Sequence, residues 1–473
     1  MRFDCDLVVI GGGAGGLVVA SVAGQLGLKV VLAERGQALG GDCLHHGCVP
    51  SKALLHVARV VHAARSASRF GMGVGGEVVM VRVREWVAGA VATIQRHDDP
   101  KRFRSYGVDV RFAAARLLDP HTVEVGGERL RARRVVIATG SRPALPGLSG
   151  LEAGGFLTNE SVFDLESLPR SLLVLGGGPI AVEMAQAFAR LGSRVTVVTR
   201  RGRILSRDDP ELAALLQARM AQEGVRFLTT PRWLRLERKS GRWVLVYASE
   251  TDEGRASAEA LLVATGRVPN VEGLGLEAAG VEWGPGGIRV DARQRTSQRH
   301  IYAVGDVCGP FRFTHMAEHQ AGVVIANAVF RTPKRVDYRA VPRVTYSDPE
   351  LAQVGPTLAE AQQEDPRVRP LDFPLAAVDR AVTEGVSEGL IRLLVRGRRV
   401  VGASILAPHA GELIHEVALG LRRGITVGDL AATIHAYPTY AQGLRRAANQ
   451  FYGPRLFSSF SRRLARWLAR LPG

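Results

Sequence analysis

The chain has 473 residues, an apolar fraction of 46% and 54 glycines, and this length predicts about two to four domains rather than one hydrophobic core. Its formal net charge of +17 is carried almost entirely by arginines, which are scattered along the chain instead of being grouped with aromatic residues. We therefore do not expect nucleic-acid binding, and we interpret the charge as a compositional bias that also attracts anionic ligands.

The first predicted element is a buried strand at residues 6–10, an apolar run without alternation. Three glycines with the spacing of a dinucleotide-binding turn follow it: Gly11, Gly13 and Gly16. A helix comes next, and a second strand at residues 30–33 ends in Glu34, which can accept hydrogen bonds from a ribose 2′-hydroxyl. We therefore interpret the uncharged stretch Leu7–Leu28 as part of a nucleotide-binding unit, and we expect no membrane span.

The most informative run covers residues 40–52 and contains Cys43 and Cys48, which can sit on one turn at a helix start and form a reversible disulfide. The chain begins without the basic and then apolar pattern of a signal segment, so we expect a cytoplasmic protein, in which disulfides are more often catalytic than structural. A zinc site is the alternative, but Cys5 and Cys308 have no partner at ligand spacing. We predict a redox pair and no metal site.

Two histidines, His45 and His46, stand between these cysteines. They form either a soft-metal or pKa-tuning site beside the thiols, or part of an ordinary helix surface. We favour the surface interpretation for metal binding, and we expect one of them to influence a thiol pKa.

The strand–turn–helix–strand pattern recurs at residues 172–198, with Gly176, Gly178 and Ala181 at the turn. Where the first copy has Glu34, this copy has Thr199. Three arginines follow: Arg200, Arg201 and Arg203. Loss of the acid and gain of guanidinium groups favour a 2′-phosphate, and hence NADPH over NADH. The alternative is a solvated strand end in an arginine-rich protein.

Two further segments resemble each other, residues 135–140 and 261–266. Each is a buried strand that ends in Ala-Thr-Gly, with Gly140 and Gly266 as the last residues, and each could close one nucleotide-binding unit. Near residue 301 a third strand leads to Asp306, a carboxylate suited to bind a polyol.

The C-terminal tail, residues 453–473, has apolar residues at helical spacing: Phe460, Leu464, Trp467, Leu468 and Leu471. Arginines lie between them: Arg462, Arg463, Arg466 and Arg470. This pattern predicts a basic amphipathic helix, which either packs on its own subunit or a dimer partner, the favoured interpretation, or lies on an anionic membrane surface.

Taken together, these motifs resemble the class I pyridine nucleotide-disulphide oxidoreductases, a family that includes glutathione reductase, dihydrolipoamide dehydrogenase and mercuric reductase. The resemblance implies an α/β fold of two Rossmann-like dinucleotide-binding domains plus an α+β C-terminal dimerisation domain, in a homodimer. The implied division is an FAD-binding domain at 1–150 and 271–340, an NAD(P)H-binding domain at 151–270, a dimerisation domain at 341–452 and the tail at 453–473.

The resemblance also implies a role for each of the main site residues. Electrons pass from NADPH through FAD to the cysteine disulfide, with Cys48 next to the flavin and Cys43 meeting the substrate. Lys52 lies near flavin N5 and pairs with Glu183, and Asp306 holds the ribitol chain. The remaining implied cofactor contacts are Gly41, Gly140, Gly266, Thr314 and His315.

One departure from the family concerns its acid/base pair, which is normally a histidine followed five residues later by a glutamate. Here Tyr437 occupies the histidine position and Gln442 the glutamate position. His435 is two residues too early, so we interpret it as a packing or capping residue. A tyrosine with a pKa near 10 is a poor acid/base at neutral pH, which argues against glutathione or lipoamide as the main substrate.

Residues 183–193 and 345–351 look most like mercuric-reductase-related members. Such reductases usually end in a vicinal cysteine pair that captures Hg(II), whereas this chain has no cysteine after Cys308. Efficient mercury reduction is therefore not expected.

The sequence thus predicts an FAD- and NAD(P)H-dependent reductase acting on a disulfide, a metal ion or another small electron acceptor. One alternative is a dihydrolipoamide dehydrogenase or glutathione-reductase-type disulfide reductase. Another is a membrane-associated redox or binding component with incidental reductase activity. The physiological acceptor does not follow from the sequence.

Overall fold

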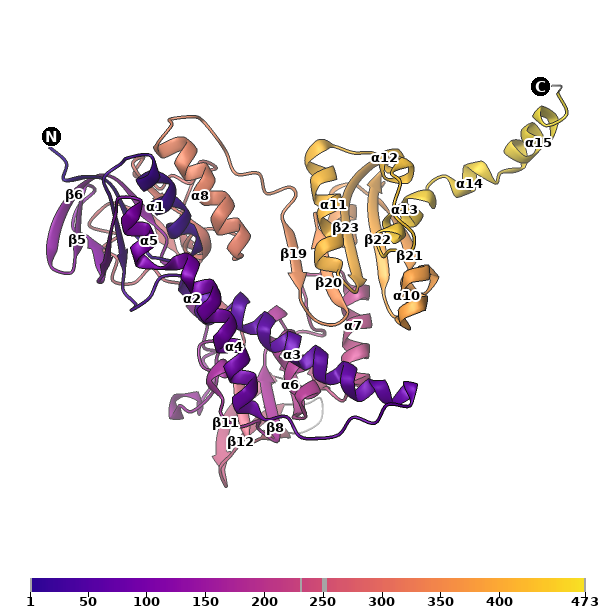
Figure 1. The fold of residues 1–473 in the computed structure, drawn as a ribbon, viewed down its shortest axis with the longest axis horizontal. Helices are drawn as coiled ribbons and strands as arrows, with labels where there is room; N and C mark the ends of the chain where they lie inside the picture. Colours follow the sequence, from indigo (N-terminus) through magenta and orange to yellow (C-terminus); the bar gives the residue numbers. More distant parts are fainter. Residues whose placement is uncertain (1, 230–231, 249–252, 472–473) are drawn as a thin grey trace.

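The computed structural model describes residues 2–229, 232–248 and 253–471, which form three lobes and a projecting C-terminal tail (Figure 1). The first lobe is built on a seven-stranded sheet of order β3-β2-β1-β6-β5-β4, in which β18 also pairs with β6. Its strands are β1 (Cys5–Ile10), β2 (Val30–Glu34), β3 (Val108–Phe112), β4 (Ala115–Leu117), β5 (Thr122–Val125), β6 (Glu128–Ile137) and β18 (Ile301–Ala303). Its helices are α1 (Ala14–Gln25), α5 (Pro100–Ser105) and α8 (Thr314–Ala328).

Strand β1 lacks alternation because both of its faces are covered. Leu7 and Val9 pack into one apolar cluster with α1 and α8, whereas Val8 and Ile10 pack into another on the opposite face. Such two-sided burial is typical of parallel strands in α/β proteins. The stretch Leu7–Leu28 is divided between β1, the glycine turn and α1.

The second lobe repeats this plan with a parallel sheet of order β10-β9-β8-β14. Its elements are β8 (Ser171–Leu175), β9 (Arg194–Thr199), β10 (Arg226–Thr229), β14 (Ala260–Val263), α6 (Pro179–Leu191) and α7 (Pro210–Gln222). An antiparallel sheet covers it: β11 (Arg232–Lys239), β12 (Arg242–Ala248) and β13 (Glu253–Ala258). The helices α2 (Gly41–His45), α3 (Cys48–Ser66) and α4 (Met80–Gln95) lead from the first lobe to this one, where α3 packs on α6 (Figure 1).

Short strand pairs lie at the connections between these lobes. They are β7 (Ser141–Pro143) with β15 (Arg267–Pro269), and β16 (Trp283–Gly284) with β17 (Gly287–Ile288). The first pair joins the residues that follow the two Ala-Thr-Gly turns.

The third lobe is an antiparallel sheet of order β19-β20-β23-β22-β21. Its strands are β19 (Pro342–Thr345), β20 (Glu350–Val354), β21 (Arg369–Pro374), β22 (Leu390–Arg396) and β23 (Arg399–Ala407). Its helices are α9 (Leu358–Glu364), α10 (Asp379–Glu384), α11 (Ala410–Arg423), α12 (Val427–Ala432) and α13 (Gln442–Asn449), and the tail adds α14 (Gly453–Leu456) and α15 (Ser459–Leu468). The predicted fold class, two Rossmann-like units plus an α+β lobe, is therefore confirmed.

Two local expectations need correction. Cys43 and Cys48 do not share a helical turn, since α2 ends at His45 and α3 begins at Cys48. The tail helix ends at Leu468, so Arg470 and Leu471 follow it. Among the described residues, no helix combines the length and the apolar character that a bilayer crossing requires.

Candidate redox active site

The two cysteines of the 40–52 run face each other across the break between α2 and α3. Both are free cysteines in the structure. The break depends on Gly47, because a Cβ there would lie 2.9 Å from the carbonyl oxygen of Asp42 and 3.0 Å from the Cα of Cys43. A glycine at this position therefore lets the two cysteines come together.

The pair is electrostatically asymmetric. A hydrogen bond from Cys43, reinforced by the Thr314 hydroxyl and the charge of Lys52, lowers the pKa of Cys48 to about 6 despite its burial. The same hydrogen bond, together with burial, raises the pKa of Cys43. Cys48 Sγ lies 3.6 Å from Thr314 Oγ1, and it stands at the positive end of α3, which also favours a thiolate. The negative charge of the reduced pair therefore rests on Cys48.

The other two cysteines differ from this pair in their electrostatics. Burial raises the pKa of Cys5 to about 11, and burial also raises the pKa of Cys308. Cys48 is therefore the cysteine suited to react as a thiolate at neutral pH.

The histidines between the redox cysteines make backbone contacts. His45 Nε2 lies 2.9 Å from the carbonyl oxygen of Leu39, and the carbonyl of His46 accepts a hydrogen bond from Asn159. Neither ring is among the principal influences on the thiol pKa values, so the expected tuning by one of them is not supported. Within the described ranges, no group of three His, Cys, Asp or Glu side chains could hold a metal ion.

A lysine and a glutamate lie beside the cysteines. Lys52, one turn along α3 from Cys48, donates to Glu183 Oε2 at 2.9 Å. Burial disfavours the charged lysine, but the charge and hydrogen bond of Glu183 outweigh this and raise the pKa of Lys52. Tyr346 completes the group, since its backbone N–H donates to Glu183 Oε1 at 2.9 Å and the Lys52 Nζ lies 4.4 Å from its ring centroid.

The first glycine turn forms a close-packed cradle at the start of α1. A Cβ on Gly11 would lie 2.4 Å from the carbonyl oxygen of Ala138, and one on Gly16 would lie 1.9 Å from that of Gly11. Gly13 faces Gly41, whose φ is +62°. Because Gly13 caps α1 without a side-chain hydrogen bond, the first amides of that helix remain available to a phosphate.

The acid at the end of β2 holds the same turn together. Glu34 accepts hydrogen bonds from the amides of Gly12 and Gly36, both at 2.7 Å. It therefore supports the turn through its backbone while lying at the position expected for a ribose contact.

Asp306 lies in a half-buried polar cluster that joins the two Ala-Thr-Gly turns. It accepts a 2.6 Å hydrogen bond from Ser141 and lies 3.7 Å from Arg267, and burial raises its pKa. Arg267 also pairs at 2.9 Å with Asp42, the residue before Cys43. This guanidinium therefore links the Asp306 region to the redox helix α2.

Three further predicted cofactor residues are Gly140, Gly266 and His315. Gly140 and Gly266 have φ values of +68° and +140°, a region that favours glycine. His315 stacks on Phe313, and its Nε2 lies 3.0 Å from the carbonyl oxygen of Pro342. The His315 ring therefore contacts Phe313 and Pro342, whereas the hydroxyl of the neighbouring Thr314 contacts Cys48.

The second glycine turn has the same shape as the first. A Cβ on Gly176 would lie 2.2 Å from the carbonyl oxygen of Ala264, whereas the space beside Gly178, at the start of α6, is open. Thr199 is buried where the first unit has Glu34, and its hydroxyl accepts from the amide of Arg201.

The three arginines after Thr199 have different surroundings. Arg203 donates to the carbonyl oxygens of Leu205 and Ser206, among others, so it holds the following loop. Arg200 lies over the ring of Trp233, at 4.9 Å. Arg201 is exposed, and the described residues give its guanidinium no carboxylate partner within salt-bridge distance.

The segment between α12 and α13 contains the substituted acid/base positions. Tyr437 is 69% exposed, Gln442 begins α13, and neither contacts the cysteine pair within one described chain. His435 is held by Glu416 at 3.2 Å and by the carbonyl of Thr433, so both ring nitrogens are occupied.

Three residues of the site were missed by the sequence analysis: Ser141, Arg267 and Tyr346. Ser141 and Arg267 directly follow the two Ala-Thr-Gly turns, so the repeat of that motif was a usable signal. Tyr346 had no such signal, because its contacts to Lys52 and Glu183 exist only once the third lobe is in place.

Comparison with known proteins adds two family matches. Residues 5–321 match the family described as pyridine nucleotide-disulphide oxidoreductase, and residues 341–448 match the dimerisation domain of the same name. Together they cover both glycine turns, the cysteine pair and the segment of Tyr437.

Among the curated relatives, a dihydrolipoyl dehydrogenase from Thermus scotoductus is 37% identical and covers 94% of this chain and 97% of its own. A mercuric reductase from Lysinibacillus sphaericus is 35% identical and covers 94% of this chain and 82% of its own. Among solved structures, the HOCl-induced flavoprotein disulfide reductase RclA from Escherichia coli is 26% identical, with a TM-score of 0.85, and the match covers 94% of this chain and 99% of RclA. A Cu(II) complex of RclA is also similar, with a TM-score of 0.84.

Proposed function

The chain belongs to the pyridine nucleotide-disulphide oxidoreductase family, whose members are FAD-dependent enzymes that use NAD(P)H, and from this we propose that it carries electrons from NADPH through FAD to Cys43 and Cys48, and on to a small acceptor. The observation that carries the proposal is the asymmetric thiol pair. Cys48 has a lowered pKa, and Cys43 retains the proton. Such a pair of one thiolate and one thiol can give up two electrons and one proton as it becomes a disulfide.

The residues of the first unit fit FAD. The cradle of Gly11, Gly13 and Gly16 would be blocked by any Cβ at two of its positions, and it presents free amides to a diphosphate. Asp306 would hold the ribitol chain, while Lys52 and Thr314 would lie beside the isoalloxazine ring. When bound, FAD supplies a two-electron carrier between the nicotinamide and the disulfide.

We assign different roles to the two cysteines. Cys48, with its low pKa and its contact to Thr314 at the start of α8, is the flavin-side thiolate. Cys43, with its raised pKa, exchanges with the acceptor. The charge of Lys52 lowers the pKa of Cys48 and so supports a thiolate at neutral pH, whereas the charge of Glu183 acts against it.

The second unit is proposed to prefer NADPH. A buried Thr199 replaces the acid that would repel a 2′-phosphate, and the exposed Arg201 two residues later has no carboxylate partner among the described residues. Arg200 is held against Trp233 and offers a flat cationic surface to the adenine. Arg203 is not assigned to cofactor binding, because its guanidinium donates to the carbonyl oxygen of Leu205 in its own loop.

The acceptor class follows from the Tyr437 segment. A tyrosine and an amide do not supply the acid/base pair that typically contributes about 10²–10⁴-fold in rate when a thiol leaving group must be protonated. We therefore propose acceptors that need no such step, namely small electrophiles and thiophilic metal ions such as Cu(II). Reduction of lipoamide or glutathione is the second candidate, because a relative of 37% identity is named dihydrolipoyl dehydrogenase.

Anaerobic titration of the FAD-loaded protein with NADPH tests the cysteine roles. Two-electron reduction is expected to produce a long-wavelength thiolate-to-flavin absorption band. Cys48→Ser abolishes this band, whereas Cys43→Ser shows it without any reductant. Identical spectra from the two variants would contradict the assignment.

A panel of acceptors tests the substrate class. We expect Cu(II) and small quinones to be reduced faster than oxidised glutathione or lipoamide. Turnover of lipoamide at the rate of a dedicated dehydrogenase would instead support the second candidate.

A further inference from the structure

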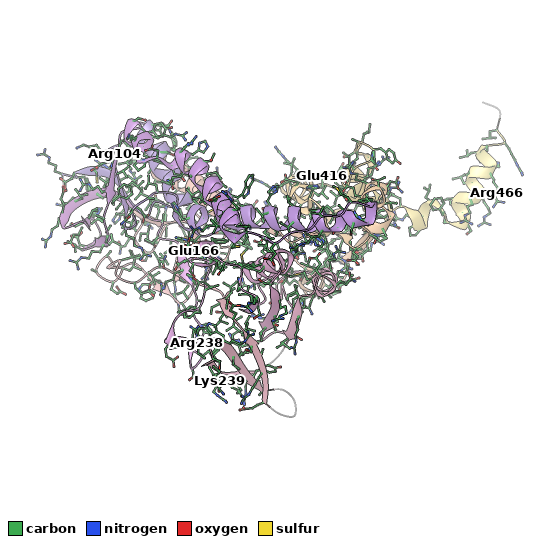
Figure 2. All side chains as sticks on the ribbon, turned by 60° about the horizontal axis from the view of Figure 1, so that its bottom comes forward. Arg104, Glu166, Arg238, Lys239, Glu416 and Arg466 are labelled. Atoms are coloured by element: carbon green, nitrogen blue, oxygen red, sulfur yellow. The ribbon has the colours of Figure 1, made fainter. Side chains whose placement is uncertain are left out.

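The chain continues beyond the core of the third lobe as two short helices, α14 and α15. Phe451 and Tyr452 still belong to the apolar core of the lobe. After them, none of the described residues up to 471 is buried. Figure 1 shows the segment projecting away from the body, and Figure 2 shows Arg466 at its far end.

One side of this segment is apolar and exposed. Its large apolar residues are Leu456, Phe457, Phe460, Leu464, Trp467, Leu468 and Leu471, and each is at least 41% exposed. At 3.6 residues per turn, the members within α15 fall in an arc of roughly 100°. An apolar stripe of this width is a contact surface, yet the described part of the chain does not cover it.

The opposite side of the segment is purely basic. Its charged residues are Arg455, Arg462, Arg463, Arg466 and Arg470, and the chain has no aspartate or glutamate after Asp429. No described carboxylate lies within salt-bridge distance of these guanidiniums, unlike many arginines of the body, such as Arg190 and Arg392. The charge of the tail is therefore available to a partner.

We propose that α14 and α15 dock the enzyme on an anionic phospholipid surface, independently of the reductase function. Arginines flanking a stripe of Phe, Leu and Trp match a helix that lies in the headgroup region with its apolar face about 5–10 Å deep. An anionic surface matches this basic tail better than a second copy of the chain does, because each copy carries a net charge of +17.

Co-sedimentation of the FAD-loaded homodimer with phospholipid vesicles tests the proposal. Wild type is compared with a chain that ends at Tyr452 and with a permuted tail that carries Arg463→Leu, Leu464→Arg, Arg466→Trp and Trp467→Arg. The permuted tail keeps the composition and the charge but destroys the apolar stripe. Vesicles of phosphatidylcholine mixed with phosphatidylglycerol are compared with pure phosphatidylcholine, at low and high salt.

Wild type is expected to partition onto the anionic vesicles at least about tenfold more strongly than either variant. It should also lose most of this binding at high salt, where the Debye length falls to about 3 Å. The double variant Arg129→Gln with Arg226→Gln removes two exposed charges from the body and should bind as wild type does.

Three outcomes would overturn the proposal. Equal binding by wild type and the shortened chain would show that the tail makes no membrane contact. Equal binding by the permuted tail would show a nonspecific charge effect rather than a docked helix. Dissociation of the shortened chain into monomers, with no vesicle binding by wild type, would assign the tail to the dimer partner instead.

Discussion

Cys48 owes its low pKa to groups from three different elements. Cys43 comes from α2, Thr314 begins α8, and Lys52 follows one turn later on α3. Glu183 acts in the opposite sense, because its negative charge raises the pKa of the thiol. Lys52 and Glu183 therefore shift the pKa of Cys48 in opposite directions, and each side chain can be replaced separately.

Replacing these partners should move the ionisation of Cys48 in opposite directions. Lys52→Met raises its pKa above about 6 because a stabilising positive charge is lost, and Glu183→Gln lowers it. The pH profile of iodoacetamide alkylation of the reduced protein measures this, since the rate falls as the pH drops through the pKa of the thiol. Thr314→Val, which removes a hydrogen bond but no charge, should also raise the midpoint. Unchanged midpoints in all three variants would contradict the assignment of the charge to Cys48.

Arg201 gives a second test at a single residue. A charge-assisted hydrogen bond contributes about 1.5–3 kcal/mol, so Arg201→Ser should lower kcat/KM for NADPH by about 10–100-fold. The value for NADH should change little, because that cofactor lacks the 2′-phosphate. Arg207→Ser removes the same charge from an exposed position further along the same loop and serves as the control. Wild-type protein that used NADH and NADPH equally well would contradict the preference.

Among the elements, α6 is held along its length by the third lobe. Glu183, Gln186 and Arg190 recur at helical spacing and so lie on one face. All three contact residues 346–348: Glu183 binds the amide of Tyr346, Gln186 binds the backbone of Asp348, and Arg190 pairs with the Asp348 carboxylate at 2.7 Å. The position of Glu183 at the redox site therefore depends on contacts made further along the same helix.

Arg190→Met should destabilise the protein by about 3–5 kcal/mol, because it leaves two carboxylates without their buried partner. Burial opposes ionisation of Asp348 and Glu223, but Arg190 outweighs it and lowers the pKa of both. The stabilisation is therefore present above the ordinary carboxylate pKa and is lost as the pH falls through the lowered values. Urea unfolding at several pH values should show a difference between wild type and variant that shrinks in acid.

Arg219→Met provides the matched control for this experiment. Arg219 pairs with the same Glu223 at 3.1 Å, but its side chain is 36% exposed. Its loss should cost less than about 1 kcal/mol. If Arg190→Met and Arg219→Met lowered the free energy of unfolding equally, burial would not determine how strongly each arginine stabilises the protein.

These networks also show what sequence patterns could and could not predict. Local signals were enough for β1, α1, β8 and α6, because strand, glycine turn and helix are adjacent in the chain. The cysteine pair was found in the same way. The break between α2 and α3 was missed, because it depends on the close approach at Gly47, and the hydrogen bond from Arg203 to Leu205 depends on the path of a loop. Contacts between lobes, such as Arg267 with Asp42, have no local pattern.

At the scale of the whole molecule, the third lobe matches a dimerisation domain and supports a homodimer. Large apolar side chains are exposed in the segment between α12 and α13, where Ile434 is 93% and Tyr437 69% exposed. Within one described chain, Tyr437 contacts neither redox cysteine. We therefore propose that Tyr437 acts in acceptor reduction at the cysteine pair of the partner subunit, across the two-fold interface.

Mixed dimers distinguish this arrangement from one in which each subunit is self-sufficient. As a homodimer, each variant should reduce the acceptor more slowly than wild type. Cys43→Ser lacks the exchanging thiol, and Tyr437→Ala lacks the tyrosine hydroxyl. A dimer of one Cys43→Ser chain and one Tyr437→Ala chain, isolated by two affinity tags, contains one site with both defects and one intact site. It should recover about half of the wild-type rate, since a two-fold dimer has two equivalent sites. No recovery would place Tyr437 with the cysteines of its own subunit, and a fully active Tyr437→Ala homodimer would remove it from the site altogether.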